Sequence, residues 1–408
     1  MNEKQMKEQL ESYGQGLLVQ AFDTWDENEK AQFLNQMENM DLGLLDSIHQ
    51  GSVEETKGKL EPLAGISIKQ IQEQKQKYDE LGIKAILDGK VGAVLLAGGQ
   101  GTRLGFDKPK GMFNIGVDTE RYIFQCLIEN LMDVTKRCGV FVPLYIMTSE
   151  KNHDDTTGFF AEHDYFGYPR EYISFFKQDM APSVDYDGKL LLEAKGKLVL
   201  SPNGNGGWFS SMARAGLLDD VKRRGIEWLN VFAVDNVLQR IADPCFVGAV
   251  IDSGCVSGAK VVRKAEPEER VGVLCLEDGR PSIVEYYEMT DDMIHLRDED
   301  GNLAYAFGVI LNYLFRVDKL EQIRDNRMPV HVVEKKIPHM APDGSSVSPE
   351  EPNGYKFEEL ILDMIHLLDD CLPYEVDRER EFAPVKNKTG VDSVDSAREL
   401  LRKNGVKL

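Results

Sequence analysis

Basic residues follow a glycine-rich turn near the end of the first quarter of this 408-residue chain. The segment LLAGGQGTRLG covers residues 95–105, and KPKG follows at 108–111. Glycines let the main chain approach an anion closely and turn its N–H groups towards it. Arg103, Lys108 and Lys110 add the positive charge that amides lack. These residue types at this spacing predict a loop that wraps a polyphosphate.

The same turn does not match two better-known phosphate loops. A dinucleotide fingerprint would need glycine in place of Leu104, and no Walker sequence is present. A purely structural turn is the alternative, and the nearby Arg103 and Lys110 favour phosphate binding over it.

A second glycine-rich segment, SPNGNGGW, covers residues 201–208. Glycine and asparagine in alternation favour left-handed backbone, which can bring main-chain groups flat against a base. A plain surface turn is the alternative.

An acidic residue, Asp235, follows the apolar run at 231–234. Open parallel sheets bind ligands at the carboxyl ends of their strands, and a carboxylate there can hold Mg²⁺ against phosphate oxygens. The alternative is that Asp235 caps the next helix.

Other polar residues are less informative on their own. Lys356 and Lys386 stand in isolation, as solvated surface lysines usually do, and the seven histidines form no triad or metal set. None of the six cysteines has zinc-binding spacing, so we expect buried thiols.

Strand-length apolar runs alternate with helical segments from residue 91 onwards. They cover residues 91–97, 141–147, 229–234, 259–262 and 271–276. This alternation predicts an α/β fold with a Rossmann-like, mixed but mainly parallel sheet covered on both faces. Asp278-Gly279 indicates a hairpin turn, so part of the sheet is expected to be antiparallel.

The sequence suggests three domains. Residues 1–90 show short helical stripes and predict a helical subdomain, with a coiled-coil surface as the alternative. Residues 91–330 are expected to form the catalytic α/β domain, which carries the phosphate-binding loop and Asp235. Residues 331–408 are expected to complete the site, with one helix carrying Phe357, Leu360 and Met364 on a face and another over 393–408.

The formal net charge of −21 argues against nucleic acid or an anionic membrane as a partner. No apolar run reaches the ~20 residues that cross a bilayer, and the first residues do not resemble a secretory signal. We therefore expect a cytoplasmic protein. Its oligomeric state cannot be deduced from these features.

Taken in order, these segments resemble the eukaryotic-type UDP-sugar pyrophosphorylases, and within them the UDP-N-acetylglucosamine pyrophosphorylase branch. The resemblance extends over residues 10–387. The LAGGQGTRLG run is specific for sugar nucleotidyltransferases, whereas the 202–207 loop, Val-Asp-Asn at 234–236 and Val-Glu-Tyr at 284–286 are typical of this branch. It implies the nucleotide-diphospho-sugar transferase fold, which resembles GT-A.

The resemblance also implies roles for individual residues. The phosphates and ribose of UTP would contact Leu96, Ala97, Gly98, Gly99, Arg103 and Lys110. Gln178 and Gly204 would read the uracil, and Lys356 would bind the nucleotide. The sugar would contact Asn205, Gly272, Glu285 and Tyr286, and its phosphate Lys386. Asp235 would carry Mg²⁺.

Three features depart from the family pattern. Asn203 stands where the family loop has Asp, and Val309 replaces an Asn that faces the sugar. The chain also ends soon after Lys386, where longer relatives continue. The Val309 substitution leaves open whether glucose or galactose 1-phosphate is accepted in place of N-acetylglucosamine 1-phosphate.

The implied reaction is uridylyl transfer from UTP to a sugar 1-phosphate, which releases pyrophosphate. It needs no protein nucleophile, because the sugar phosphate attacks the α-phosphorus in line while Arg103, Lys110, Lys386 and Mg²⁺ absorb charge. Two other classes remain as alternatives, a glycosyltransferase that uses a UDP-sugar and a non-catalytic nucleotide-sugar sensor.

Overall fold

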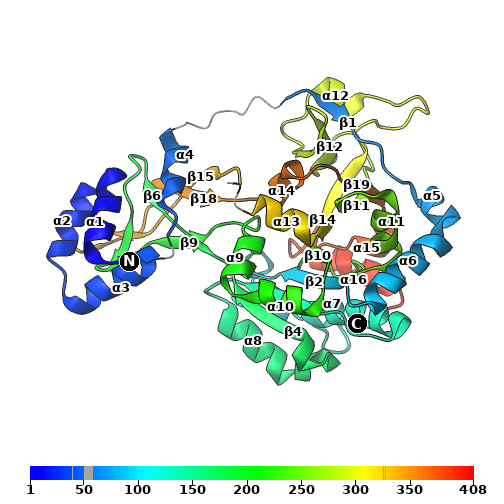
Figure 1. Cartoon of the computed structure of the whole chain (residues 1–408), viewed down its shortest axis with the longest axis horizontal. Helices are drawn as coiled ribbons and strands as arrows, with labels where there is room; N and C mark the ends of the chain where they lie inside the picture. The colour runs from blue at the N-terminus through cyan, green and yellow to red at the C-terminus, as the bar shows by residue number, and fades with distance from the viewer. Residues whose placement is uncertain (39, 50–57, 325, 327) are drawn as a thin grey trace. The chain divides into compact units, whose positions relative to one another are not determined.

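The computed structural model describes residues 1–38, 40–49, 58–324, 326 and 328–408. Its contacts divide the chain into two compact units, each assembled from separate segments (Figure 1). The first unit contains residues 1–57, 179–207 and 328–361, and the second contains 58–178, 208–327 and 362–408. The three sequence domains, 1–90, 91–330 and 331–408, remain a prediction.

The first unit combines short helices with small antiparallel sheets. Its helical elements are α1 (Glu3–Ser12), α2 (Gly16–Asp23), α3 (Glu27–Glu38), η1 (Leu42–Leu45) and α4 (Asp46–His49). Its strands are β5 (Met180–Pro182), β6 (Val184–Asp185), β7 (Leu192–Ala194), β8 (Lys197–Leu198), β9 (Leu200–Pro202), β15 (His331–Lys335), β16 (His339–Met340), β17 (Ser346–Val347) and β18 (Gly354–Glu358). The apolar stripes of α1 to α3 pack with Ala181 and Phe357 in one core, so the unit itself buries the faces for which a coiled-coil partner was the alternative.

The second unit is a large sheet flanked by helices. Its strands are β1 (Leu60–Pro62), β2 (Val91–Leu96), β3 (Leu144–Thr148), β4 (Ile173–Lys177), β10 (Trp228–Ala233), β11 (Ser257–Arg263), β12 (Val273–Glu277), β13 (Arg280–Val284), β14 (Phe307–Arg316) and β19 (Leu372–Glu375). Its helices are α5 (Ile68–Glu73), α6 (Lys75–Leu87), α7 (Ile123–Cys138), α8 (His153–Glu162), α9 (Trp208–Arg214), α10 (Leu217–Arg224), α11 (Pro244–Ser253), α12 (Asp291–His295), α13 (Val317–Ile323), α15 (Arg378–Glu381) and α16 (Val394–Lys403), with α14 (Ile361–Leu367) at the unit boundary. Short 3-10 turns are η2 (Thr102–Leu104), η3 (Lys110–Met112), η4 (Asp164–Gly167) and η5 (Arg170–Tyr172).

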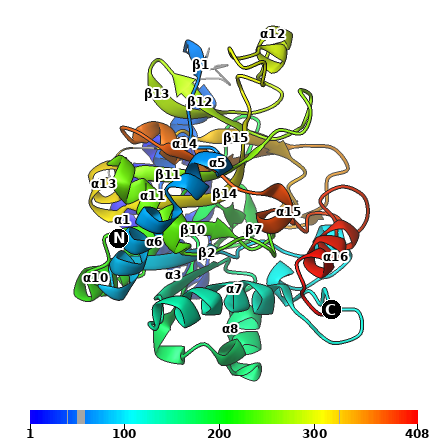
Figure 2. The ribbon, with the colours of Figure 1, turned by 90° about the vertical axis from the view of Figure 1, so that its right-hand side faces the viewer.

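Strands β10, β2, β3 and β4 pair in parallel in that order, and β14 joins β10 antiparallel. Strand β2 is buried along its whole length, as expected for a strand covered on both faces. Both ribbon views place α7 and α8 on the same side of β2 (Figures 1 and 2). The mixed α/β class predicted from the sequence is therefore confirmed.

The predicted hairpin is also present, since β12 and β13 pair antiparallel on either side of Asp278 and Gly279. Both turn residues have positive φ, 50° and 81°, as a type I′ turn requires. The helix predicted through Phe357 was wrong at its start. Residues 354–358 form β18 against β15, and the helix begins at Ile361, because Phe357 fits an apolar strand position as well as a helical one. Among the described residues, no helix is long and apolar enough to cross a membrane.

Candidate functional site

The second unit contains a point where the strand order reverses. From β2 the chain continues outward through β3 to β4, while the later strand β10 pairs on the other side of β2. In open α/β sheets ligands bind in the crevice outside the carboxyl ends of the strands at such a point. The glycine-rich segment follows β2 directly and Asp235 follows β10, so both lie at this edge.

The segment after β2 forms a loop closed by its own main chain. Gly101 N–H donates to the carbonyl of Lys108 at 2.9 Å, and Lys110 N–H donates to the carbonyl of Gly99 at 3.1 Å. Arg103 lies in the turn η2 and is exposed, whereas Lys110 is half-buried at the base of the loop. The fold thus presents both cations from one short closed segment.

Side chains that follow the neighbouring strands β3 and β4 support the start of this loop. The buried Asn152 amide donates to the carbonyl of Ala97 at 2.9 Å and accepts from Ser149 N–H at 2.7 Å. A Cβ on Gly98 would lie only 2.7 Å from Oε1 of Gln178, which directly follows β4. Gln178 is buried, so the residue predicted to read uracil lies against the glycine predicted to hold the nucleotide.

A distant segment brings Lys386 to the same edge. Val385 N–H donates to the carbonyl of Asp235 at 2.9 Å, and residues 236 and 384 form an antiparallel bridge. The buried Asn236 side chain donates to the carbonyl of Glu381 at 2.8 Å. These bonds place Lys386 next to Asp235, although the two segments are far apart in sequence.

Three of the predicted residues lie close enough to Lys110 for their charges to act on its ammonium group. Burial lowers the pKa of Lys110, and the positive charges of Arg103 and Lys386 lower it further, while Asp235 opposes the shift. Each of these three groups therefore acts directly on the Lys110 ammonium. A nearby anion would relieve both the desolvation and the repulsion between the cations.

Several of these charges have no protein partner in the described part of the chain. No hydrogen bond or ion pair occupies the side chains of Arg103, Lys110 or Asp235 among residues 1–38, 40–49, 58–324, 326 and 328–408. Lys108 differs, because it pairs with Asp155 at 2.9 Å on the surface. Lys386 lies 3.2 Å from Asp392 in an exposed pair. The helix-cap alternative for Asp235 is wrong, since Asp243 caps the next helix, α11.

Three of the predicted sugar contacts also lie together. A Cβ on Gly272 would be 3.3 Å from Oε1 of Glu285, and the Gly272 carbonyl accepts from Val309 N–H at 2.9 Å. Tyr286 is 43% exposed, and the Arg270 guanidinium lies 5.9 Å from its ring centre. The half-buried Val309 is thus a direct neighbour of Gly272, one of the predicted sugar contacts.

The remaining predicted residues belong to the first unit. Gly204 has φ of 90° and a Cβ there would lie 2.2 Å from the carbonyl of Glu359, so only glycine fits this position. The Asn205 side chain accepts from Ile361 N–H at 3.0 Å. Burial lowers the pKa of Lys356 on β18. The loop 203–207 is therefore held by residues 359–361 of the same unit.

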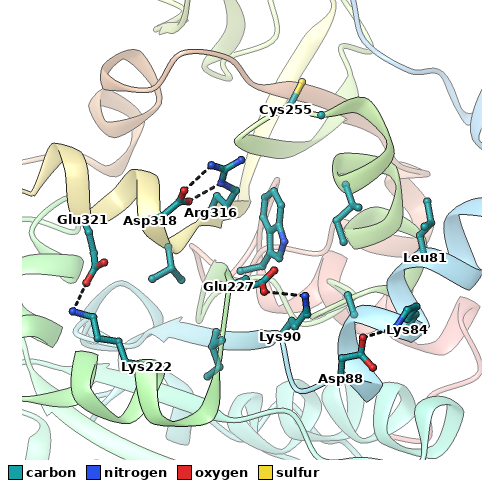
Figure 3. Close-up of a pocket in the computed structure, with 16 residues that line it drawn as sticks. Leu81, Lys84, Asp88, Lys90, Lys222, Glu227, Cys255, Arg316, Asp318 and Glu321 are labelled. Carbon is teal, nitrogen blue, oxygen red and sulfur yellow. Dashed lines mark hydrogen bonds and ion pairs between the residues drawn. The ribbon is translucent and has the colours of Figure 1, made fainter.

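A pocket of about 710 Å³ lies at the opposite, amino ends of β2 and β10 (Figure 3). Its charged side chains form four ion pairs: Lys84–Asp88, Lys90–Glu227, Lys222–Glu321 and Arg316–Asp318. Because these lining charges already neutralise one another, this pocket offers no excess positive charge to a triphosphate. The unpaired cations at the carboxyl edge fit that ligand better.

Comparison with known families agrees with this geometry. Residues 44–404 match the family described as UTP–glucose-1-phosphate uridylyltransferase. The chain belongs to this family. It is therefore a nucleotidyltransferase, as the sequence predicted, and such enzymes generally use a divalent metal.

The relatives are named for N-acetylated sugars. The chain is 35% identical to the mouse UDP-N-acetylhexosamine pyrophosphorylase-like protein 1, over 96% of this chain and 82% of that protein. It is 36% identical to Arabidopsis thaliana UDP-N-acetylglucosamine diphosphorylase 2, over 97% and 82%. The crystal structure of the Trypanosoma brucei uridine diphosphate N-acetylglucosamine pyrophosphorylase in complex with an inhibitor matches with a TM-score of 0.84 at 28% identity, covering 98% of this chain and 84% of that one. These matches confirm the predicted family and fold.

Two supporting residues were missed from the sequence, Asn152 and Asn236. Each is fully buried and uses its amide to hold a main-chain group beside the predicted loop or beside Asp235. Asn236 could have been found, because an amide directly after a strand-end acid is well placed to fix the turn. Nothing in the sequence around Asn152 distinguishes it from an ordinary turn residue.

Proposed function

We propose that this protein transfers the uridylyl group of UTP to N-acetylglucosamine 1-phosphate. A phosphate oxygen of the sugar phosphate forms a new bond to the α-phosphorus, and the bond from that phosphorus to the β-bridging oxygen breaks. Pyrophosphate leaves with the electron pair. The names of the relatives and the family match support this reaction.

The observation that carries the proposal is the meeting of Arg103, Lys110, Asp235 and Lys386 at the reversal point of the sheet. Arg103 and Lys110 would bind the triphosphate, and Lys386 would bind the sugar phosphate. Catalysis of this kind depends on holding two anions in line and on stabilising the charge that develops between them. Arg103 and Lys110, whose side chains have no ion-pair partner among the described residues, suit that task, and the exposed pair of Lys386 with Asp392 is weak enough to exchange for a phosphate.

The site also fits a magnesium ion that arrives with the nucleotide. The described residues contain no group of three or more histidine, cysteine or acidic side chains that could enclose a metal by themselves. The Asp235 carboxylate has no hydrogen-bond or ion-pair partner among the described residues, and Mg²⁺ commonly takes one or two carboxylates together with substrate phosphates and water. When bound there, Mg²⁺ would supply countercharge to the phosphate oxygens.

The remaining predicted residues are assigned by the same proposal. Uracil would be read by Gln178 and Gly204, and the phosphates and ribose would contact the main chain of residues 96–99. The sugar would contact Asn205, Gly272, Glu285 and Tyr286, and Lys356 would bind the nucleotide. A cytoplasmic location remains a prediction.

One observation favours a second sugar substrate. The family description names glucose 1-phosphate, and Val309 stands beside Gly272 where the family pattern has a hydrogen-bonding Asn. A pocket that lacks a polar contact discriminates weakly between an N-acetyl group and a hydroxyl. Glucose or galactose 1-phosphate is therefore the second candidate.

A panel of sugar 1-phosphates with UTP and Mg²⁺, scored by pyrophosphate release, tests both candidates. We expect release with N-acetylglucosamine 1-phosphate, and a weaker preference over glucose 1-phosphate than the about 10⁴-fold that a polar site can impose. Tight binding of a UDP-sugar without pyrophosphate release from any member of the panel would point instead to a sensor. Transfer of sugar from UDP-sugar to an acceptor would point to a glycosyltransferase.

A further inference from the structure

A buried cluster of charges lies at the start of the segment that leads to Lys386. The Lys260 ammonium on β11 is 2.6 Å from the Glu381 carboxylate and 3.2 Å from that of Asp243. Lys260 has 0% exposure, and both acids are buried. Arg240 approaches Asp243 at 3.9 Å.

Burying this cluster costs free energy, so it adds little to the stability of the core. Burial raises the pKa of Glu381, even though Lys260 opposes the shift. Buried ion pairs contribute little net stability, because the loss of hydration offsets the attraction between the charges. A short, directional ion pair can, however, fix the position of the backbone segments to which its residues belong.

The chain segment that follows Glu381 leads directly to the proposed substrate site. Glu381 ends α15, and the next residues pair with the turn after β10, where Val385 N–H donates to the carbonyl of Asp235 at 2.9 Å. Asn236 binds the carbonyl of Glu381, and Lys260 binds its carboxylate. The segment 381–386 is thus held at its first residue from two sides, and its last residue is Lys386.

We propose that Glu381, held in place by its ion pair with Lys260, is a positioning residue for Lys386. Through Lys386 it would also position the phosphate of the sugar 1-phosphate. This inference rests on the proposed function. Glu381 touches neither substrate: its carboxylate faces Lys260 in the core, away from solvent. Loss of this ion pair should weaken the binding of the sugar phosphate and leave UTP binding through Arg103 and Lys110 intact.

The test compares Glu381→Ala with Glu381→Gln. The alanine variant removes the partner of Lys260, so we expect the KM for the sugar 1-phosphate to rise about tenfold, a change of about 1.4 kcal/mol, while the KM for UTP stays within about twofold. The glutamine variant keeps an oxygen that can accept from Lys260, so it should recover most of this loss. Equal changes in both KM values, or no change in either, would overturn the inference.

A double-mutant cycle with Lys386→Ala makes the test specific. If Glu381 acts through Lys386, Glu381→Ala adds no further rise in the sugar phosphate KM once Lys386 is gone, whereas independent effects would add. Tyr145→Phe is the matched control. It removes a partly buried hydrogen bond to a carboxylate, from the buried Tyr145 to Asp220 at 2.8 Å, and should lower the Tm while leaving the sugar phosphate KM unaltered.

Amide hydrogen exchange separates this inference from the proposed function. In Glu381→Ala, we expect faster exchange in peptides covering 383–387 with the rest of the sheet still protected. This readout needs no turnover, so it stands even if the wild-type protein releases no pyrophosphate. Wild-type exchange in that segment would overturn the positioning role, whatever reaction the protein catalyses.

Discussion

Replacing Lys110 by methionine should lower turnover strongly and at the same time stabilise the free protein. The Lys110 ammonium is half-buried, repelled by Arg103 and Lys386, and attracted by Asp235. Its folded-state pKa lies below that of the unfolded chain, so at neutral pH the charged form costs stability. That cost begins to fall once the pH exceeds the lowered pKa and is gone above the ordinary lysine pKa. It is also removed when a neutral side chain of similar length takes the place of Lys110.

The expected loss of activity follows from the role of the cation. In the reaction, the half-buried Lys110 would face charge that develops on the transferring phosphoryl group. Removing one such preorganised group typically costs about 3–4 kcal/mol, or about 10²–10³-fold in kcat. We therefore expect Lys110→Met to lose at least about a hundredfold in kcat.

Initial rates of pyrophosphate release and thermal unfolding without ligand measure the two effects. Lys108→Met is the matched control, because it removes a cation from the same loop whose charge is already paired with Asp155 on the surface. This control should stay within about twofold of wild type, as exposed pairs contribute little. If Lys110→Met retained near-normal kcat, or if its Tm fell as far as that of a core variant, the electrostatic reasoning for the site would be refuted.

Three further changes test neighbouring parts of the site. In wild type, kcat/KM should fall on the alkaline side at a pH below the ordinary lysine pKa of ~10.4. In Lys110→Arg this fall should move to higher pH, because the guanidinium keeps its proton. A pH–rate profile in which the fall does not move would exclude Lys110 as the titrating group. Asp235→Asn should raise the Mg²⁺ concentration for half-maximal activity by about tenfold and lower kcat, and an unchanged magnesium titration would remove Asp235 from the metal site. Gly98→Ala would place a methyl group 2.7 Å from Oε1 of Gln178, so the KM for UTP should rise about tenfold with little loss of Tm, and an unaltered KM would contradict a uracil-reading role for Gln178.

Much of the sheet could be predicted from apolar runs alone. The segments at 91–97, 229–234 and 259–262 became β2, β10 and β11, because buried parallel strands are continuous apolar stretches with clear ends. The Asp278-Gly279 hairpin was equally legible, since few residue pairs accept two positive φ angles. Local chemistry determines both features, so a local reading of the sequence finds them.

The composition of the two units could not be predicted in this way. Residues 179–207 and 328–361 join residues 1–57 through pairings such as β6 with β18, and their side chains share a core with helices from the start of the chain. Short strands of two or three residues leave almost no periodic signal. The strand at 354–358 was missed for the same reason, since Phe357 continued an apparent helical stripe.

The same distinction applies to the site. The glycine loop and Asp235 each follow a strand, so the rule for carboxyl ends of parallel strands brings them together without any knowledge of the family. Lys386 reaches them only because residues 381–385 add to the turn after β10, 145 residues away in the contact between Asn236 and Glu381. The charges of these residues indicate that the arrangement is more favourable when an anionic ligand is bound. In a chain of net charge −21, Lys110 is repelled by Arg103 and Lys386 although Asp235 opposes this repulsion, so a bound polyphosphate would gain binding energy by offsetting it.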